Sequence, residues 1–322
     1  MNLRTVQRRL AVLLPEARPA GTGESTLEIA GQGMDAPRLV SATMIEKGPL
    51  QAHRVFDPPA VGFRAFLDGT QRSEVASYVG NVPIVLGHAA AVVRERRNRR
   101  MHTWGKPLVE TRLYCPRSRI APAAWETLRR EYPGVLVDTG DGETDLTLHP
   151  LALRDAAVHR VLAHREELEQ RLAEAWCKRE EEPLFIDGGI TGSEVVAVSD
   201  CTVGVVKSHL TLYADVDTLG IVTELEHRYR SSVFRVTSRK RATVASWYLR
   251  LRDPVGRDPM WGLVRVEVAH PAPESIDRIG ERADEVSRWI LAEASPLALP
   301  DARWDKMVYG VRDCEEFLRA LQ

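Results

Sequence analysis

Two apolar runs in this sequence each end in Asp-Gly, and their aspartates are the first candidates for chemistry. One run covers residues 63–70 and contains Asp68, and the other covers residues 183–189 and contains Asp187. A short run of bulky residues that stops at a turn is typical of a buried strand, so both carboxylates are expected at the rim of a sheet. Like charges a few ångströms apart oppose each other's ionisation, so two such carboxylates usually need a cation between them.

A pair of acids around a cation is the beginning of metal-dependent phosphodiester cleavage. Two divalent ions about 3.5–4 Å apart can generate a hydroxide, polarise the phosphoryl oxygen and neutralise the leaving group. Hard cations such as Mg²⁺ and Mn²⁺ prefer carboxylate oxygens, so a third acid should join the two aspartates.

The third acid is expected on the long helix that the sequence predicts over residues 151–179. Glu169 and Glu166 lie on the same face as the apolar residues of this helix, Leu162, Leu172, Ala173 and Trp176. An acid inside an apolar stripe is costly unless it is paired or bound to a metal. The helix leads directly into the second Asp-Gly strand, which places Glu169 near Asp187. Glu166, one turn away, fits almost as well, and the sequence does not decide between them.

Basic residues supply candidates for contacts with a phosphate backbone. Lys207 closes the short strand predicted over residues 201–207, where it could neutralise a scissile phosphate. Two further clusters could hold nucleic acid through charge and counterion release. Their members are Arg96, Arg97, Arg99 and Arg100 in the first and Arg239 and Lys240 in the second.

The elements that must position these residues indicate a mixed α/β fold. Residues 1–59 begin with a short amphipathic helix and continue with Gly- and Pro-rich sequence, which predicts an arm or linker for dimerisation or partner docking. Residues 60–322 are expected to form the main domain. Strands are predicted before and after the long helix, and further helices over residues 276–294 and 313–321.

Composition and charge restrict the function classes. A hydrophobic share of 44% and a charged share of 28% are typical of a globular protein, and the net charge of -1 means that nucleic-acid binding must come from local patches. The four cysteines show no zinc-like spacing and are expected to be reduced thiols. No stretch approaches the roughly 18 apolar residues of a membrane span. A cytoplasmic location is therefore expected.

The motifs, taken in order, resemble the NurA nuclease domain family. In that family a first strand ends in Asp-Gly-Ser/Thr, a glutamate lies on a helix, and a second strand ends in Asp-Gly before a Val/Ile-Gly-Val-Val-Lys strand. The matching positions here are Phe66-Leu67-Asp68-Gly69-Thr70, Glu169, Phe185-Ile186-Asp187-Gly188-Gly189 and Val203-Gly204-Val205-Val206-Lys207. Residues 247–251 and 261–268 are similar to the family's two late strands.

The resemblance covers about residues 60–322 and implies an RNase H-like mixed sheet flanked by helices. It implies manganese- or magnesium-dependent nuclease activity on DNA, with Asp68, Glu169 and Asp187 as metal ligands and Lys207 and Tyr309 at the site. It also implies a homodimer and a hexameric HerA-type ATPase as partner, in DNA repair or phage defence. Exonuclease activity is expected, with endonuclease activity as a further option.

The C-terminal segment departs from the family pattern. The family often closes with Tyr-Pro and a histidine several residues later, whereas Tyr309 is followed by Gly310 and no histidine follows His270. If that histidine is a metal ligand in the family, then either Asp313 or Glu315 replaces it here or the metal affinity is lower. Two rival functions stay open at this point: a non-catalytic adaptor of a motor ATPase, and an RNase H-fold phosphotransferase.

Overall fold

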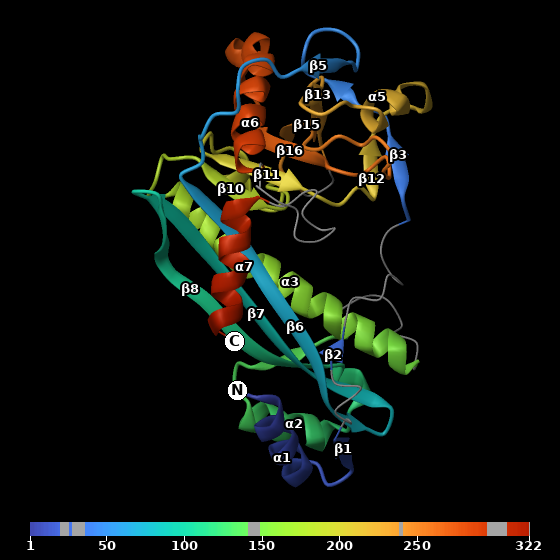
Figure 1. Cartoon of the computed structure of the whole chain (residues 1–322). Coiled ribbons are helices and arrows are strands. Elements are labelled where there is room, and N and C mark those ends of the chain that lie inside the picture. The colour runs from blue at the N-terminus through green and yellow to red at the C-terminus, as the bar shows by residue number, and fades with distance from the viewer. Residues whose placement is uncertain (20–25, 28–35, 141–148, 238–240, 295–307, 322) are drawn as a thin grey trace. The chain divides into compact units, whose positions relative to one another are not determined.

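The computed structural model describes residues 1–19, 26–27, 36–140, 149–237, 241–294 and 308–321, and the chain forms two compact units. The first unit comprises residues 1–34, 69–91 and 107–168, and the second comprises residues 35–68, 92–106 and 169–322. Each unit is therefore assembled from separate stretches of the chain. Three long strands and one long helix contribute residues to both (Figure 1).

The second unit is built on a mixed sheet. The start of β6 (Ala65–Val79) runs parallel to β10 (Leu184–Asp187), which runs parallel to β11 (Thr202–Val206). The sheet then continues through antiparallel strands. These are β16 (Leu263–Ala269), β15 (Val244–Arg250), β14 (Phe234–Val236) and β4 (Thr43–Met44).

Helices cover both faces of this sheet. On one face, α6 (Ile279–Glu293) lies beside β15 and β16 (Figure 1), where Trp247 donates a hydrogen bond to the Ser287 hydroxyl at 3.0 Å. On the same face, α7 (Tyr309–Leu321) packs Gly310 against the ring of Phe66. The last turns of α3 (Pro150–Cys177) lie on the opposite face, where Trp176 contacts Trp104.

Smaller elements complete the second unit. In the large sheet, β5 (Ala52–Arg54) pairs with β13 (Tyr229–Ser231). A separate two-stranded sheet consists of β3 (Arg38–Val40) and β12 (Thr211–Tyr213). Short helices connect the strands, namely α4 (Glu194–Ala197), α5 (Leu219–Thr223), η2 (Val216–Thr218) and η3 (Pro273–Arg278).

The first unit contains the remaining parts of β6, β7 (Val82–Arg97) and β8 (Arg100–Cys115), with α3 up to Leu168. Its core joins the apolar sides of α1 (Leu3–Leu13) and α2 (Pro122–Glu131) to the strands. Its other elements are β1 (Ala17–Pro19), β2 (Thr26–Leu27), η1 (Arg117–Arg119) and β9 (Leu136–Asp138). In the described ranges, no helix is long and apolar enough to cross a membrane.

The predicted mixed α/β architecture, a mixed sheet flanked by helices, is confirmed. One strand boundary differs from the prediction. The first Asp-Gly does not end a strand, because β6 continues without interruption from Ala65 to Val79. The polar residues after Gly69 stay in the strand because β1 and β2 pair with this part of β6. Asp68 therefore lies within a long strand, whereas Asp187 ends β10 as predicted.

Residues 1–59 do not follow the boundary of either compact unit. The strands β4 and β5 hydrogen-bond to β14 and β13 of the second unit, while α1 belongs to the first. Residues 20–25 and 28–35 lie outside the described ranges. A role of this segment in dimerisation or partner docking stays a prediction.

Candidate active site

The register of two parallel strands brings Asp68 and Asp187 together. Leu67 of β6 is paired with Ile186 of β10, and each aspartate is the next residue along its strand. Neighbouring strands lie about 4.8 Å apart, and paired residues point to the same face of a sheet. The two carboxylates therefore stand side by side on one face, with Asp68 only 5% exposed and Asp187 half-buried.

An aromatic cluster fixes the strand segments that carry the two acids. The rings of Phe66 and Phe185 lie 5.8 Å apart, and Phe63 contacts both. Each of the paired phenylalanines is two residues before an aspartate, so the rings and the carboxylates share a face. Packing of these rings defines the positions of the strand backbones at the site.

The helix α7 covers this same face beside Asp68. A side chain at Gly310 would lie 2.2 Å from the Phe66 ring, so glycine permits the close approach of helix and strand. The Cys314 thiol donates to the backbone carbonyl of Phe66 at 3.3 Å. Burial, and then the negative charge of Asp68, raises the pKa of Cys314. Asp68 is therefore close enough to α7 for its charge to affect the pKa of Cys314 on that helix.

Lys207 pairs with the more exposed of the two acids. Its Nζ lies 2.8 Å from Oδ2 of Asp187, and both side chains are partly accessible to solvent, Lys207 by 26% and Asp187 by 18%. Lys207 follows the last residue of β11, the strand next to β10. Three neighbouring strands of the sheet thus place a carboxylate within β6, a second carboxylate at the end of β10 and an ammonium directly after β11.

The turn after Asp187 is held by a buried glutamate. Glu267, only 2% exposed, accepts a hydrogen bond from the Ile190 backbone N–H at 2.8 Å and one from Arg265 at 2.6 Å. Gly188 has a φ of 140°, a conformation that other residues rarely adopt. The Glu267 side chain therefore supports this turn from the face of the sheet opposite the aspartates.

Replacing Glu267 with glutamine should weaken the fold more than the loss of a surface pair would. The amide keeps an acceptor for Ile190 but loses the charge that faces Arg265, which costs about 1.5–3 kcal/mol for a hydrogen bond to a charged group. Urea unfolding measures the difference. Glu285→Gln is the control, because Glu285 forms a partly exposed pair with Arg282 and should cost less than about 1 kcal/mol. Equal losses in the two variants would contradict the supporting role of Glu267.

The two alternatives for the third acid differ in exposure. The Glu166 side chain is 61% exposed and lies 4.0 Å from Arg165, whereas Glu169 is half-buried. Glu169 lies on α3, on the face of the sheet opposite α7. To approach the two aspartates, the Glu169 side chain would have to pass the end of β10. This strand stops at Asp187, whereas the neighbouring β6 continues to Val79. Glu174, farther along α3, accepts from Ser193 at 2.6 Å in the chain that follows that end.

Tyr309 begins α7 and is 44% exposed, next to the Gly310 that packs on Phe66. On the same helix, Asp313 accepts a hydrogen bond from Arg94 at 2.5 Å, and Arg94 also donates to the Thr103 hydroxyl. Glu315 pairs with Arg312 and Arg319. The two acids that could replace the missing histidine are thus both engaged with arginines.

The arginines of the first basic cluster have different environments. Arg96 is held by both oxygens of Glu293 at 2.7 and 2.8 Å, and Arg97 is exposed but pairs with Glu95. Arg99 and Arg100 are exposed at the β7–β8 turn, where Asn98 and Arg99 have positive φ. Trp104, which follows this cluster in the sequence, packs on Trp176 and donates to Glu180 at 2.8 Å. Arg239 and Lys240 lie outside the described residues.

The donor set suits a hard divalent cation. Two neighbouring carboxylates supply the oxygen ligands that Mg²⁺ and Mn²⁺ prefer, and Gly69 and Gly188 follow them directly. Among the residues that the structure describes, no group of three or more His, Cys, Asp or Glu side chains is arranged to hold a metal ion. The pair Asp68 and Asp187 is what the structure brings together, and Glu169 as third ligand stays a prediction.

Comparisons with known proteins give one kind of match. No protein-family model matches the chain, and no curated protein matches it in sequence. Among solved structures, the chain is similar to the crystal structure of the NurA nuclease from Sulfolobus solfataricus, with 11% sequence identity and a TM-score of 0.47. The match covers 83% of this chain and 82% of that one. Similarity of this degree assigns no role to any residue, so the function has to be argued from the site.

Proposed function

We propose that this protein is a metal-dependent nuclease that cleaves DNA. The observation that carries the proposal is the register of β6 and β10, which sets Asp68 beside Asp187 on one face of the sheet. The order of the sequence motifs, which resembles the NurA family, supports the same chemistry. Asp68 and Asp187 would hold Mn²⁺ or Mg²⁺, with Glu169 as the third ligand.

The metal and the residues around the two acids would have separate roles in DNA binding and cleavage. When bound, the metal would activate a water and stabilise charge on the phosphoryl oxygens. Lys207 forms an ion pair with Asp187, and its ammonium would donate to a phosphate oxygen when DNA binds. Tyr309 would lie near the substrate from the first turn of α7. Arg99 and Arg100, and Arg239 and Lys240, would contact the DNA backbone away from the cleaved bond.

The proposal includes the setting in which the nuclease acts. A homodimer working with a hexameric HerA-type ATPase would process DNA ends in the cytoplasm, in DNA repair or phage defence. Exonuclease action would follow from DNA fed to the site by such a motor. These finer points are drawn from the sequence resemblance, and each can be tested separately.

Metal-dependent degradation of DNA by the purified protein tests the proposal. End-labelled linear single- and double-stranded DNA is incubated with Mn²⁺, Mg²⁺ or EDTA. Degradation with Mn²⁺ that EDTA abolishes is the expected result, because in this proposal the bound metal activates the attacking water. If degradation stays absent even after a HerA-type ATPase is added, the nuclease proposal fails.

One observation favours a second candidate, a non-catalytic adaptor of a motor ATPase. Asp187 already has a cationic partner in Lys207 at 2.8 Å, and an acid paired in this way needs no metal for its charge to be balanced. Isothermal titration calorimetry of Mn²⁺ binding distinguishes the two candidate functions. The nuclease should bind Mn²⁺ in a manner that Asp187→Asn abolishes, whereas the adaptor should bind none.

A further inference from the structure

Two of the four cysteines meet, although they are 24 positions apart. Cys177 is the last residue of α3, and Cys201 directly precedes β11. Their side chains lie within hydrogen-bonding reach of each other, and the Ser199 hydroxyl lies 3.1 Å from the sulfur of Cys201. The other two cysteines, Cys115 and Cys314, are completely buried elsewhere.

The backbone holds the two thiols in place from both sides. The Trp176 indole donates to the carbonyl of Glu182 at 2.9 Å, which fixes the end of α3 against the chain leading to β10. The Leu184 N–H donates to the carbonyl of Cys201 at 2.8 Å, which fixes the start of β11 beside β10. The approach of Cys177 to Cys201 is therefore a feature of the packed sheet and not of a surface loop.

The two thiols differ in acidity. The hydrogen bond from Cys177, and then that from Ser199, lowers the pKa of Cys201 to about 6, against the opposing effects of burial and Asp200. The same contact raises the pKa of Cys177, which acts as the donor. Burial raises the pKa of Cys115 to about 12 and also raises that of Cys314. At neutral pH the reactive thiolate would therefore be at Cys201, because the thiolate is the nucleophilic form of cysteine.

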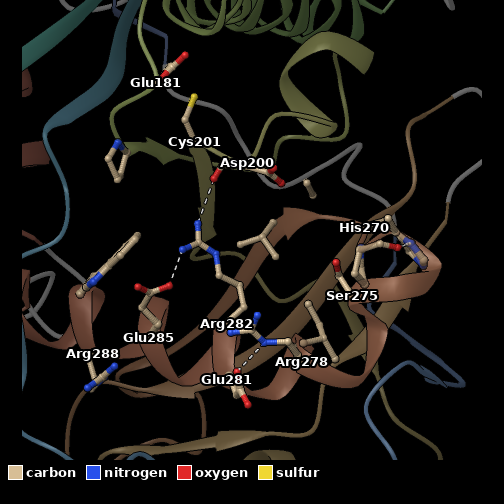
Figure 2. Close-up of a pocket in the computed structure, with 17 residues that line it drawn as sticks. Glu181, Asp200, Cys201, His270, Ser275, Arg278, Glu281, Arg282, Glu285 and Arg288 are labelled. Atoms are coloured by element: carbon tan, nitrogen blue, oxygen red, sulfur yellow. Dashed lines mark hydrogen bonds and ion pairs between the residues drawn. The ribbon is translucent and has the colours of Figure 1, made fainter.

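Cys201 borders a cavity that is large enough for a small oxidant. Cys201 lines a cavity of about 810 Å³, together with Asp200, Glu181 and residues of η3 and α6. Figure 2 shows Cys201 on the wall of this cavity between Glu181 and Asp200. Most of the other charged groups there are paired, for example Arg282 with Glu285 at 2.7 Å and Arg278 with Glu281 at 3.0 Å.

We propose that Cys201 and Cys177 form a peroxide-reactive thiol pair that closes to a disulfide. The Cys201 thiolate attacks one oxygen of hydrogen peroxide, the O–O bond breaks, and hydroxide leaves and is protonated to water. The resulting sulfenic acid is attacked by the sulfur of Cys177, so that the S–O bond breaks, the S–S bond forms and a second water leaves. In sum, two thiols and one peroxide give one disulfide and two waters. This site is independent of the proposed nuclease function.

Thiol counting on the full chain tests the pair. After treatment with a small excess of hydrogen peroxide, the denatured protein should show two reactive thiols in place of four, and a non-reducing peptide map should link Cys177 to Cys201. Cys177→Ser should instead leave a sulfenic acid at Cys201 that dimedone traps. Four remaining thiols, or a disulfide that involves Cys115 or Cys314, would overturn the proposal whatever the nuclease assay shows.

The pH dependence of alkylation gives a second test. Because Cys201 has a lowered pKa, its reaction with iodoacetamide should rise about tenfold per pH unit below about pH 6 and level off above it. Cys177→Ala removes the hydrogen-bond donor, so the midpoint should move up toward the ordinary cysteine value. Peptide mass spectrometry reads the rate for each cysteine separately. A midpoint near pH 9 in the wild-type protein would rule out an activated Cys201.

Discussion

Replacing Asp187 with asparagine is expected to lower Mn²⁺-dependent DNA cleavage by at least about 100-fold, because removal of one charged ligand costs several kcal/mol of transition-state stabilisation. The amide keeps the shape of the carboxylate but loses the charge that balances a divalent ion. Asp68→Asn should act in the same way, since the two carboxylates are neighbours in the register of β6 and β10. Initial rates of fluorescent-DNA release, with saturating Mn²⁺, measure both variants.

The loss should be one of chemistry and not of folding. Asp187 contributes an ion pair with Lys207 that is still partly accessible to solvent, so its removal should lower the stability by no more than about 1 kcal/mol. A thermal melt of each variant provides this check. Cleavage by Asp187→Asn within about threefold of wild type would remove Asp187 from the site and the nuclease proposal with it.

Two glutamates on α3 give a matched comparison for the third ligand. Glu169→Gln should reduce cleavage strongly if this half-buried acid reaches the metal past the end of β10. Glu166→Gln should leave the rate nearly unchanged, because its side chain is 61% exposed. If both variants cleave normally, the third ligand comes from elsewhere, and Asp313→Asn and Glu315→Gln on α7 are the next to examine.

The strands that carry the acids could be predicted because the information is local. A run such as Pro183 to Ile186, which stops at Asp-Gly, indicates a buried strand wherever it pairs. The length of β6 could not be read in this way. Its polar second half is held by pairing with β1, β2 and β7, and no local pattern reveals such partners. The sequence pattern therefore predicts a strand end at Asp68, although this residue lies inside a strand.

Long-range pairs explain what else the sequence did not reveal. The arginines at residues 94–100 indicate a nucleic-acid patch by composition, yet Arg94 pairs with Asp313 and Arg96 with Glu293, about 200 residues away. The Cys177–Cys201 contact depends likewise on how α3 returns to β10. Spacing along the chain carries no signal for contacts of this kind, because they are fixed by tertiary packing.

Arg230 offers the largest expected change in stability. This side chain of β13 is 2% exposed and donates to both oxygens of Glu46 at 2.8 and 3.0 Å and to Asp284 at 2.5 Å. It thereby ties residues near β4, in the segment that the sequence predicts to be a linker, to α6. Arg230→Met should cost about 3–5 kcal/mol, because breaking a buried pair leaves an uncompensated charge. Chemical denaturation measures this loss.

Lys47, which follows Glu46 in the sequence, supplies the control for Arg230→Met. Lys47 pairs with Asp277 in a largely exposed ion pair, so Lys47→Met should leave the free energy of unfolding nearly unchanged. The double variant Arg230→Met with Glu46→Met should recover part of the lost stability, since the more buried carboxylate is then gone and only the partly exposed Asp284 has lost its partner. If the double variant is less stable than Arg230→Met, the loss comes from packing and not from the unpaired charge of Glu46.

The pH dependence of the same variants follows from the charge of Glu46. Burial alone would raise the pKa of Glu46, but the hydrogen bonds and charge of Arg230 and the Val233 N–H lower it below its ordinary value of 4.5. A lowered folded-state pKa stabilises the protein above the unfolded pKa, and this stability is lost as the pH falls through the folded value. In Arg230→Met the unpaired Glu46 should gain stability on protonation. The difference in unfolding free energy between wild type and Arg230→Met should therefore shrink as the pH falls below about 4.5, and a constant difference would show that Glu46 does not carry the effect.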